Sequence, residues 1–223
     1  SDLLATRGSS LSIAYSDVRS LLPQANVIAF TPIDAFADIP SAGDLDGDGR
    51  ADLALRPGRG LGVLRGEQDR TLLPTQFSRA LPVDVPSGAV LFAANVDPRS
   101  EAPGDELLAL TDTSLVLVYS ANLGDLPTKP LYTWPGGHPP IAGEVVRGNL
   151  VLAAPGAAMP SPQDEVVFAF QGGSTLEIFE PLLLDAEGTG TWNYDGAVVP
   201  PATIAMPGTA TIKDRVFAGH ANW

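Results

Sequence analysis

The chain has 223 residues, no cysteine, and 13 Lys and Arg against 26 Asp and Glu, which gives a formal net charge of -13. Such a surface repels phosphate groups, which argues against nucleic acid or an anionic membrane as a direct partner. The absence of cysteine excludes disulfides and thiolate metal sites. No apolar run approaches the about 18 residues of a spanning helix, so insertion into a membrane is not expected.

Four segments along the chain share one pattern, in which an acidic residue precedes an apolar run, a turn and a second apolar run. Their first residues lie 50, 53 and 59 positions apart and are Asp2, Asp52, Asp105 and Asp164. A shorter motif leads into the loop of each repeat, at residues 42–44, 93–95, 142–144 and 218–220. Each repeat therefore predicts four short strands: one before the acidic loop, two in a hairpin after it, and one downstream.

The downstream strands are predicted at residues 27–30, 75–77, 131–134 and 190–194. A four-stranded unit that recurs about every 50 residues is typical of a β-propeller blade, whose faces are covered by neighbouring blades. The sequence thus predicts an all-β fold with almost no helix. Residues 1–223 would form a single β-propeller domain, or a fragment of one, with about four blade repeats at 2–43, 44–94, 95–143 and 144–219. A β-sandwich with accidental internal similarity is the alternative.

The two ends of the chain carry complementary parts of one repeat. Residues 2–6 match the strand that follows an acidic loop, and residues 215–219 match the strand that leads into one. We expect these two segments to pair, because unpaired strand edges promote aggregation. The pairing either closes a small ring or joins this chain to a companion chain or fragment in a larger propeller.

The sharpest motif is an acidic loop that leads directly into an apolar strand. Asp44, Asp46, Asp48 and Asp52 occupy its positions 1, 3, 5 and 9, and Arg50 at position 7 offers its backbone carbonyl. Calcium binds 6–8 oxygen ligands and tolerates irregular geometry, and crowded carboxylates repel one another without a cation. The loop therefore predicts a calcium site formed by these five residues. A solvated turn without metal is the alternative.

The loop is not an EF-hand, because that motif requires a glutamate at position 12. Leu55 stands there, inside the apolar run. The pattern Asp44-x-Asp46-x-Asp48-Gly49-x-x-Asp52 before an apolar strand resembles the calcium loop of FG-GAP repeats, found in integrin α-subunit propellers and many bacterial secreted proteins. The strict motif covers one loop and the looser repeat nearly the whole chain. The resemblance implies a seven- or eight-bladed propeller, calcium-binding loops on one face, and an extracellular, cell-surface or periplasmic role in adhesion or binding.

The loop of the next repeat keeps part of this pattern. Asn95 and Asp97 retain two ligand types, but Arg99 replaces the third acid. Asp105 follows Asn95 by 10 positions, whereas Asp52 follows Asp44 by 8. Asn95, Asp97 and Asp105 are therefore a second and weaker candidate metal site.

Aromatic residues provide the candidate ligand-binding surface. Trp192 and Tyr194 fall in a long insertion of the fourth repeat, and insertions in repeat arrays map to loops on one face, which is often the binding face. Their alternative role is packing in an outer strand of the blade, which is also the interpretation of Trp134.

No catalytic motif is present, and the two histidines, His138 and His220, lack a neighbouring nucleophile pattern. The recurring Asp-Glu pairs are better explained by their repeat position than by glycosidase chemistry. The sequence predicts a binding or adhesion module with structural calcium and a protein or glycan partner. The alternative is a lectin-like or enzyme subunit whose active groups come from inserted loops or a companion chain.

Overall fold

The computed structural model describes residues 3–7, 10–14, 26–29, 41–55, 62–66, 72–77, 89–97, 99, 104–120, 127, 129–134, 140, 142–146, 163–170, 174–185 and 187–205. The chain divides into two compact units. Unit 1 comprises residues 1–42 and 50–87, and unit 2 comprises residues 43–49 and 88–223. The acidic loop therefore belongs with the sheets that follow it in the chain.

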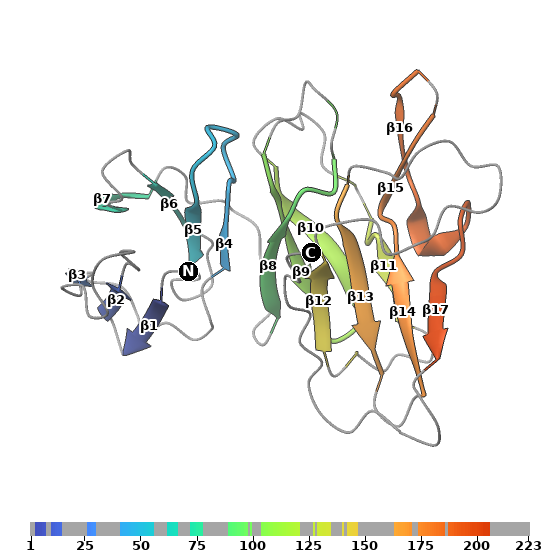
Figure 1. Cartoon of the computed structure of the whole chain (residues 1–223), viewed down its shortest axis with the longest axis horizontal. Coiled ribbons are helices and arrows are strands. Elements are labelled where there is room, and N and C mark those ends of the chain that lie inside the picture. The colour runs from blue at the N-terminus through green and yellow to red at the C-terminus, as the bar shows by residue number, and fades with distance from the viewer. Residues whose placement is uncertain are drawn as a thin grey trace, which may run out of the picture. The chain divides into compact units, whose positions relative to one another are not determined.

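Unit 1 contains two antiparallel sheets with the strand orders β1-β2-β3 and β4-β5-β6-β7 (Figure 1). The bounds of the strands are β1 (Leu3–Arg7), β2 (Ser10–Ala14), β3 (Asn26–Ala29), β4 (Ser41–Gly43), β5 (Asp52–Leu55), β6 (Gly62–Gly66) and β7 (Leu72–Phe77). Only the last residue of β4 clusters with unit 2.

Unit 2 contains two four-stranded sheets, β11-β10-β9-β8 and β12-β13-β14-β17, and a separate hairpin, β15-β16. Its elements are β8 (Val90–Ala94), β9 (Glu106–Leu110), β10 (Ser114–Tyr119), β11 (Tyr132–Thr133), β12 (Ala142–Val146), β13 (Glu165–Ala169), β14 (Thr175–Phe179), β15 (Leu182–Leu184), β16 (Gly190–Trp192), the 3-10 turn η2 (Tyr194–Gly196) and β17 (Ala202–Ala205). Figure 1 shows the two larger sheets side by side.

The all-β prediction is confirmed. Among the described residues η2 is the one helical element, and no helix there is long and apolar enough to cross a membrane. Three sheets follow the predicted order of a leading strand, a hairpin and a downstream strand. Neither unit forms a closed ring of sheets within its described residues, so the propeller remains a proposal. The predicted strand at 215–219, like His138 and His220, lies outside the described residues.

Two details of the fourth repeat differ from the prediction. Residues 190–192 do not form its outer strand: they pair with β15 in the inserted hairpin, and β17 takes the place beside β14. The insertion closes on itself because Leu182 lies opposite Trp192. The leading motif is also displaced by three residues, since Glu165 pairs with Val146 whereas the corresponding Glu106 pairs with Ala94.

The described core of unit 2 lies between its two four-stranded sheets. The central strands β9 and β13 are buried along their whole length, as expected of strands covered on both faces. An aromatic group fills the space between the sheets, and its members are Tyr132, Trp134, Phe168, Phe170 and Phe179. The interpretation of Trp134 as a packing residue is confirmed, because only 2% of its surface is exposed.

Candidate metal-binding loop

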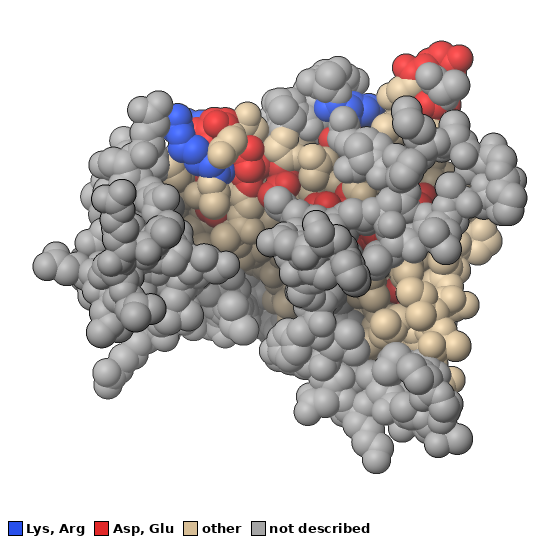
Figure 2. Space-filling view, viewed as in Figure 1, with Lys and Arg blue, Asp and Glu red and all other residues tan. Residues whose placement is uncertain are grey.

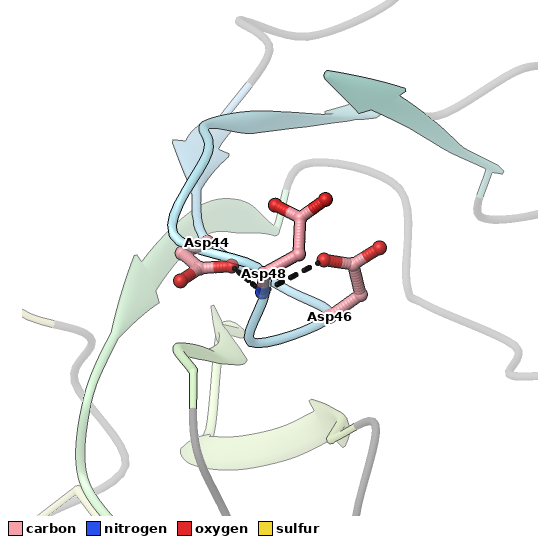
Figure 3. Close-up of side chains that lie close together, drawn as sticks. All are labelled: Asp44, Asp46 and Asp48. Atoms are coloured by element: carbon pink, nitrogen blue, oxygen red, sulfur yellow. Dashed lines mark hydrogen bonds between the residues drawn. The ribbon is translucent and has the colours of Figure 1, made fainter. Parts of the chain in front are cut away.

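The loop after β4 is folded around the side chain of its first aspartate. The two carboxylate oxygens of Asp44 accept hydrogen bonds from the backbone N–H of Asp48, at 3.0 Å, and of Gly49, at 2.9 Å. The Asp48 N–H also lies 3.2 Å from Asp46 Oδ1 (Figure 3). Gly47 and Gly49 have φ angles of 76° and 81°, which glycine adopts without the steric cost of a Cβ atom.

This fold brings three acidic side chains to one point. One carboxylate oxygen each from Asp44, Asp46 and Asp48 lies within 4.8 Å of the others (Figure 3). Calcium holds its oxygen ligands at about 2.3–2.6 Å, so two ligands of one ion lie at most about 5 Å apart. The three oxygens meet this limit, and they are the hard ligands that calcium prefers. The three carboxylates could therefore hold a divalent cation, calcium among them.

The fourth predicted carboxylate is held inside its own sheet. Asp52 is 1% exposed, and its Oδ1 accepts a hydrogen bond of 2.9 Å from the backbone N–H of Gly66. A Cβ at Gly66 would lie 2.3 Å from the carbonyl oxygen of Ala51, so this approach requires glycine. Asp52 is not one of the three clustered carboxylates. Its role as a ligand, and that of the Arg50 carbonyl, stay predictions.

The backbone of the loop is bound by the first acidic residue of the next repeat. The Asp44 N–H donates to Asp105 Oδ2 at 2.9 Å, and the Asp105 N–H donates back to the Asp44 carbonyl oxygen at 2.5 Å. We call this reciprocal pair of hydrogen bonds a clasp. It joins residues 61 positions apart and fixes the first residue of the acidic loop against the start of β9.

Two glycines make room for this clasp. Gly104 has a φ of 108°, and a Cβ there would lie 2.6 Å from the Asp44 carbonyl oxygen and 2.9 Å from the Gly47 nitrogen. A Cβ at Gly43 would lie 2.4 Å from the Ala93 Cβ and 2.6 Å from Asp105 Oδ2. Distances below 3.0 Å require something to shift. Close packing of the loop against β8 and the start of β9 thus depends on both glycines.

The same clasp occurs one repeat later. The Asn95 N–H donates to Asp164 Oδ2 at 2.8 Å, and the Asp164 N–H donates to the Asn95 carbonyl oxygen at 2.7 Å, across 69 positions. Asn95 follows β8 as Asp44 follows β4, and Asp164 precedes β13 as Asp105 precedes β9. Asp105 and Asp164 are predictable from the sequence as repeat markers, but their hydrogen bonds to the preceding loop are not. Their signal was the recurrence of an acid directly before a buried strand.

Two acids of the second candidate metal site have hydrogen-bond partners of their own, and the role of Asn95, Asp97 and Asp105 as ligands stays a prediction. Both oxygens of Asp97, which is fully buried, accept from the Arg99 guanidinium, at 2.7 Å from Nε and 2.5 Å from Nη2. Asp105 belongs to the clasp on Asp44. Asn95 Oδ1 is buried without a hydrogen-bond partner among the described residues. The Arg99 guanidinium therefore neutralises the Asp97 carboxylate of this loop.

Glu106 organises the second loop from within the same sheet. Its Oε2 accepts hydrogen bonds of 3.0 Å from the backbone N–H groups of Val96 and Asp97, and Ser120 Oγ donates to Oε1 at 3.3 Å. Burial raises the pKa of Glu106 from 4.5 to about 8, and the charge of Asp97 acts in the same direction. The two backbone N–H groups and the Ser120 hydroxyl act to lower that pKa, but burial outweighs them.

The contribution of Glu106 to the free energy of unfolding should fall as the pH rises. Between pH 4.5 and about 8 the folded protein keeps the Glu106 proton that the unfolded chain releases, so this stabilisation is full below 4.5 and is lost as the pH rises through about 8. Glu106→Gln keeps the shape but cannot ionise, so its stability should decline less over this range. Urea unfolding at a series of pH values measures the difference. Parallel pH profiles of the two proteins would contradict the prediction.

The candidate ligand-binding residues lie in the insertion and pack against the core. Trp192 and Tyr194 are partly buried on the aromatic group of unit 2, and the Lys129 ammonium lies 4.0 Å from the centroid of the Tyr194 ring. Asn193, which lies between them in the sequence, is fully buried. Its Oδ1 accepts hydrogen bonds from the backbone N–H groups of Val198 and Val199 and so holds the segment that follows η2. The structure thus supports packing for both aromatic rings and leaves their ligand-binding role a prediction.

Acidic side chains also mark the tip of the inserted β15–β16 hairpin, at the upper right of Figure 2. There the Asp185 carboxylate accepts from the backbone N–H groups of Glu187 and Thr189, at 3.1 and 2.7 Å. These hydrogen bonds account for the turn, and nothing else about it indicates a ligand.

No protein-family model matches the chain, and no match is found among the curated proteins or the solved structures.

Proposed function

We propose that this chain is a calcium-stabilised repeat protein of the β-propeller type that acts as a binding or adhesion module. The observation that carries the proposal is the convergence of Asp44, Asp46 and Asp48, whose oxygens lie within the reach of one calcium ion. Arg50 and Asp52, which follow in the chain, are the proposed further ligands. Calcium would neutralise the carboxylates and fix the loop, so its role is structural.

The propeller part of the proposal rests on the repetition of sheets and clasps. Three four-stranded sheets share one internal order, and the clasp recurs with the same donors and acceptors at Asp44–Asp105 and Asn95–Asp164. Such repetition supports a common building block more than an accidental likeness. The resemblance to FG-GAP repeats supports the same architecture and suggests an extracellular, cell-surface or periplasmic location.

A protein or glycan is the proposed partner, and the insertion of the fourth repeat is the surface that favours a protein. Val198 and Val199 are 61% and 42% exposed on a segment that Asn193 holds in place, so apolar surface is presented without loss of order. We propose no catalytic residue.

Calcium titration tests the central proposal. The wild type should take up calcium stoichiometrically, and calcium at about 100 times its dissociation constant should raise the free energy of unfolding by about 2.7 kcal/mol. Asp46→Ala combined with Asp48→Ala should abolish both effects, because it removes two of the three clustered carboxylates. Isothermal calorimetry and thermal melts with and without calcium give the two measurements.

The matched control removes the same charge elsewhere. Asp112 and Glu187 are exposed and lie outside the loop, so Asp112→Ala combined with Glu187→Ala should leave calcium uptake unchanged. Equal loss of uptake in both double variants would show that only net charge matters. No stoichiometric uptake by the wild type would refute the calcium site.

A further inference from the structure

Asp105 is not one of the three clustered carboxylates, but it is hydrogen-bonded to the backbone of the first of them, Asp44. Its Oδ2 accepts from the Asp44 N–H, and its own N–H donates to the Asp44 carbonyl oxygen. Both carboxylate oxygens of Asp44 in turn accept from the backbone N–H groups of Asp48 and Gly49. A continuous set of hydrogen bonds therefore runs from Asp105, through Asp44, to the far side of the loop.

We propose that Asp105 is a positioning residue for the calcium loop, so that calcium binding and the docking of the loop on β9 favour each other. This inference rests on the proposed calcium function. Partners behind the ligands of a metal site orient those ligands and raise the affinity for the metal. Because coupling of this kind is reciprocal, bound calcium should also strengthen the clasp.

The surroundings of Asp105 support this role. It is 6% exposed, and Gly104 before it brings the backbone against the Asp44 carbonyl oxygen and the Gly47 nitrogen. Loss of the Asp105 acceptor would leave the Asp44 N–H unsatisfied in this packed region and free the loop to change shape. Calcium would then have to order the three carboxylates as it binds, and the cost of this ordering would weaken calcium binding.

The second clasp provides a matched control within the same chain. Asp164 makes the same two hydrogen bonds, to the backbone of Asn95, but the loop after Asn95 has its acid paired with Arg99. Asp164→Ala should therefore destabilise the fold as Asp105→Ala does and leave calcium affinity unchanged. Only a residue that positions the calcium loop should change the affinity.

Calorimetric titration of the full chain with calcium chloride tests the proposal. Asp105→Ala should weaken calcium binding by about tenfold, the lower range for partners behind metal ligands. Asp105→Asn keeps an oxygen acceptor for the Asp44 N–H and should restore most of the affinity, whereas an effect of charge alone would be the same in both variants. If Asp105→Ala does not fold, Asp105→Ser, whose oxygen is one bond shorter, replaces it.

The outcomes separate the two proposals. A wild type that takes up no calcium refutes the calcium function itself. A wild type that binds calcium, with a folded Asp105→Ala or Asp105→Ser variant that binds as tightly, refutes the positioning role alone. Equal weakening by Asp164→Ala, or by Asp105→Asn, also refutes it, since the clasp on this particular loop would then not matter.

Discussion

Replacing Trp134 with alanine should lower the free energy of unfolding by about 3–5 kcal/mol, the usual cost of truncating a buried aromatic residue to alanine. Its ring packs at 5.0 Å between centroids on Phe168 of the opposite sheet and at 5.8 Å on Tyr132. Its Nε1–H also donates to the Thr111 carbonyl oxygen at 2.8 Å. The substitution would leave a large cavity between the two sheets of unit 2.

Trp134→Phe separates the two contributions to this loss. Phenylalanine keeps much of the packing and leaves the Thr111 carbonyl oxygen without the indole donor, so its cost should be about 1–3 kcal/mol. Urea unfolding followed by far-UV circular dichroism gives both values. A loss below about 1 kcal/mol for Trp134→Ala would contradict the description of this core, because substitutions of that size are typical of the surface.

Gly104→Ala should lower the free energy of unfolding by about 3 kcal/mol or more, because it adds a Cβ at a positive φ and against backbone atoms of the loop. Part of that loss is the about 1–2 kcal/mol that a non-glycine residue incurs at positive φ. The remainder comes from overlap with backbone atoms, since the new Cβ would lie 2.6 Å from the Asp44 carbonyl oxygen. Backbone atoms cannot rotate away as a flexible side chain can, so the loop must move off β9.

Gly188→Ala is the matched control for this effect. Gly188 also has a positive φ, of 80°, but a Cβ there would have no atom within 4 Å. It should therefore show the conformational cost alone, about 1–2 kcal/mol. Denaturant unfolding of the two variants under identical conditions gives the difference. Equal losses would mean that the close approach of Gly104 to the loop does not contribute to stability.

The sequence predicted the strands of this fold well where hydrophobic runs had a fixed place in the repeat. The hairpins after Asp52, Asp105 and Asp164 are present as β5–β6, β9–β10 and β13–β14. The prediction failed where an insertion offered a second candidate strand. Residues 190–194 are aromatic and β-like, as an outer strand should be, but only the pairing of Trp192 with Leu182 shows that they complete another hairpin.

The candidate site was predictable to the extent that its ligands are local. Asp44, Asp46 and Asp48 lie within five consecutive residues, so a turn is enough to bring them together. The contribution of Asp105 depends on packing between segments 61 positions apart, which no local pattern specifies. The same holds for Arg99. The sequence shows that it replaces an acid of the loop pattern, but not that its guanidinium donates two hydrogen bonds to Asp97.

The clasps also determine when each loop can be completed while the chain is being synthesised. Asp44 leaves the ribosome 61 residues before its partner Asp105, and Asn95 leaves 69 residues before Asp164. At translation rates of about 5–20 residues per second, the first interval lasts roughly 3–12 s. During that time the acidic loop exists without the clasp that holds Asp44. Each of these loops therefore forms its clasp only after the ribosome has added the first residues of the next sheet. A truncated nascent chain that ends before Asp105 would carry the three carboxylates without the hydrogen bonds to Asp44.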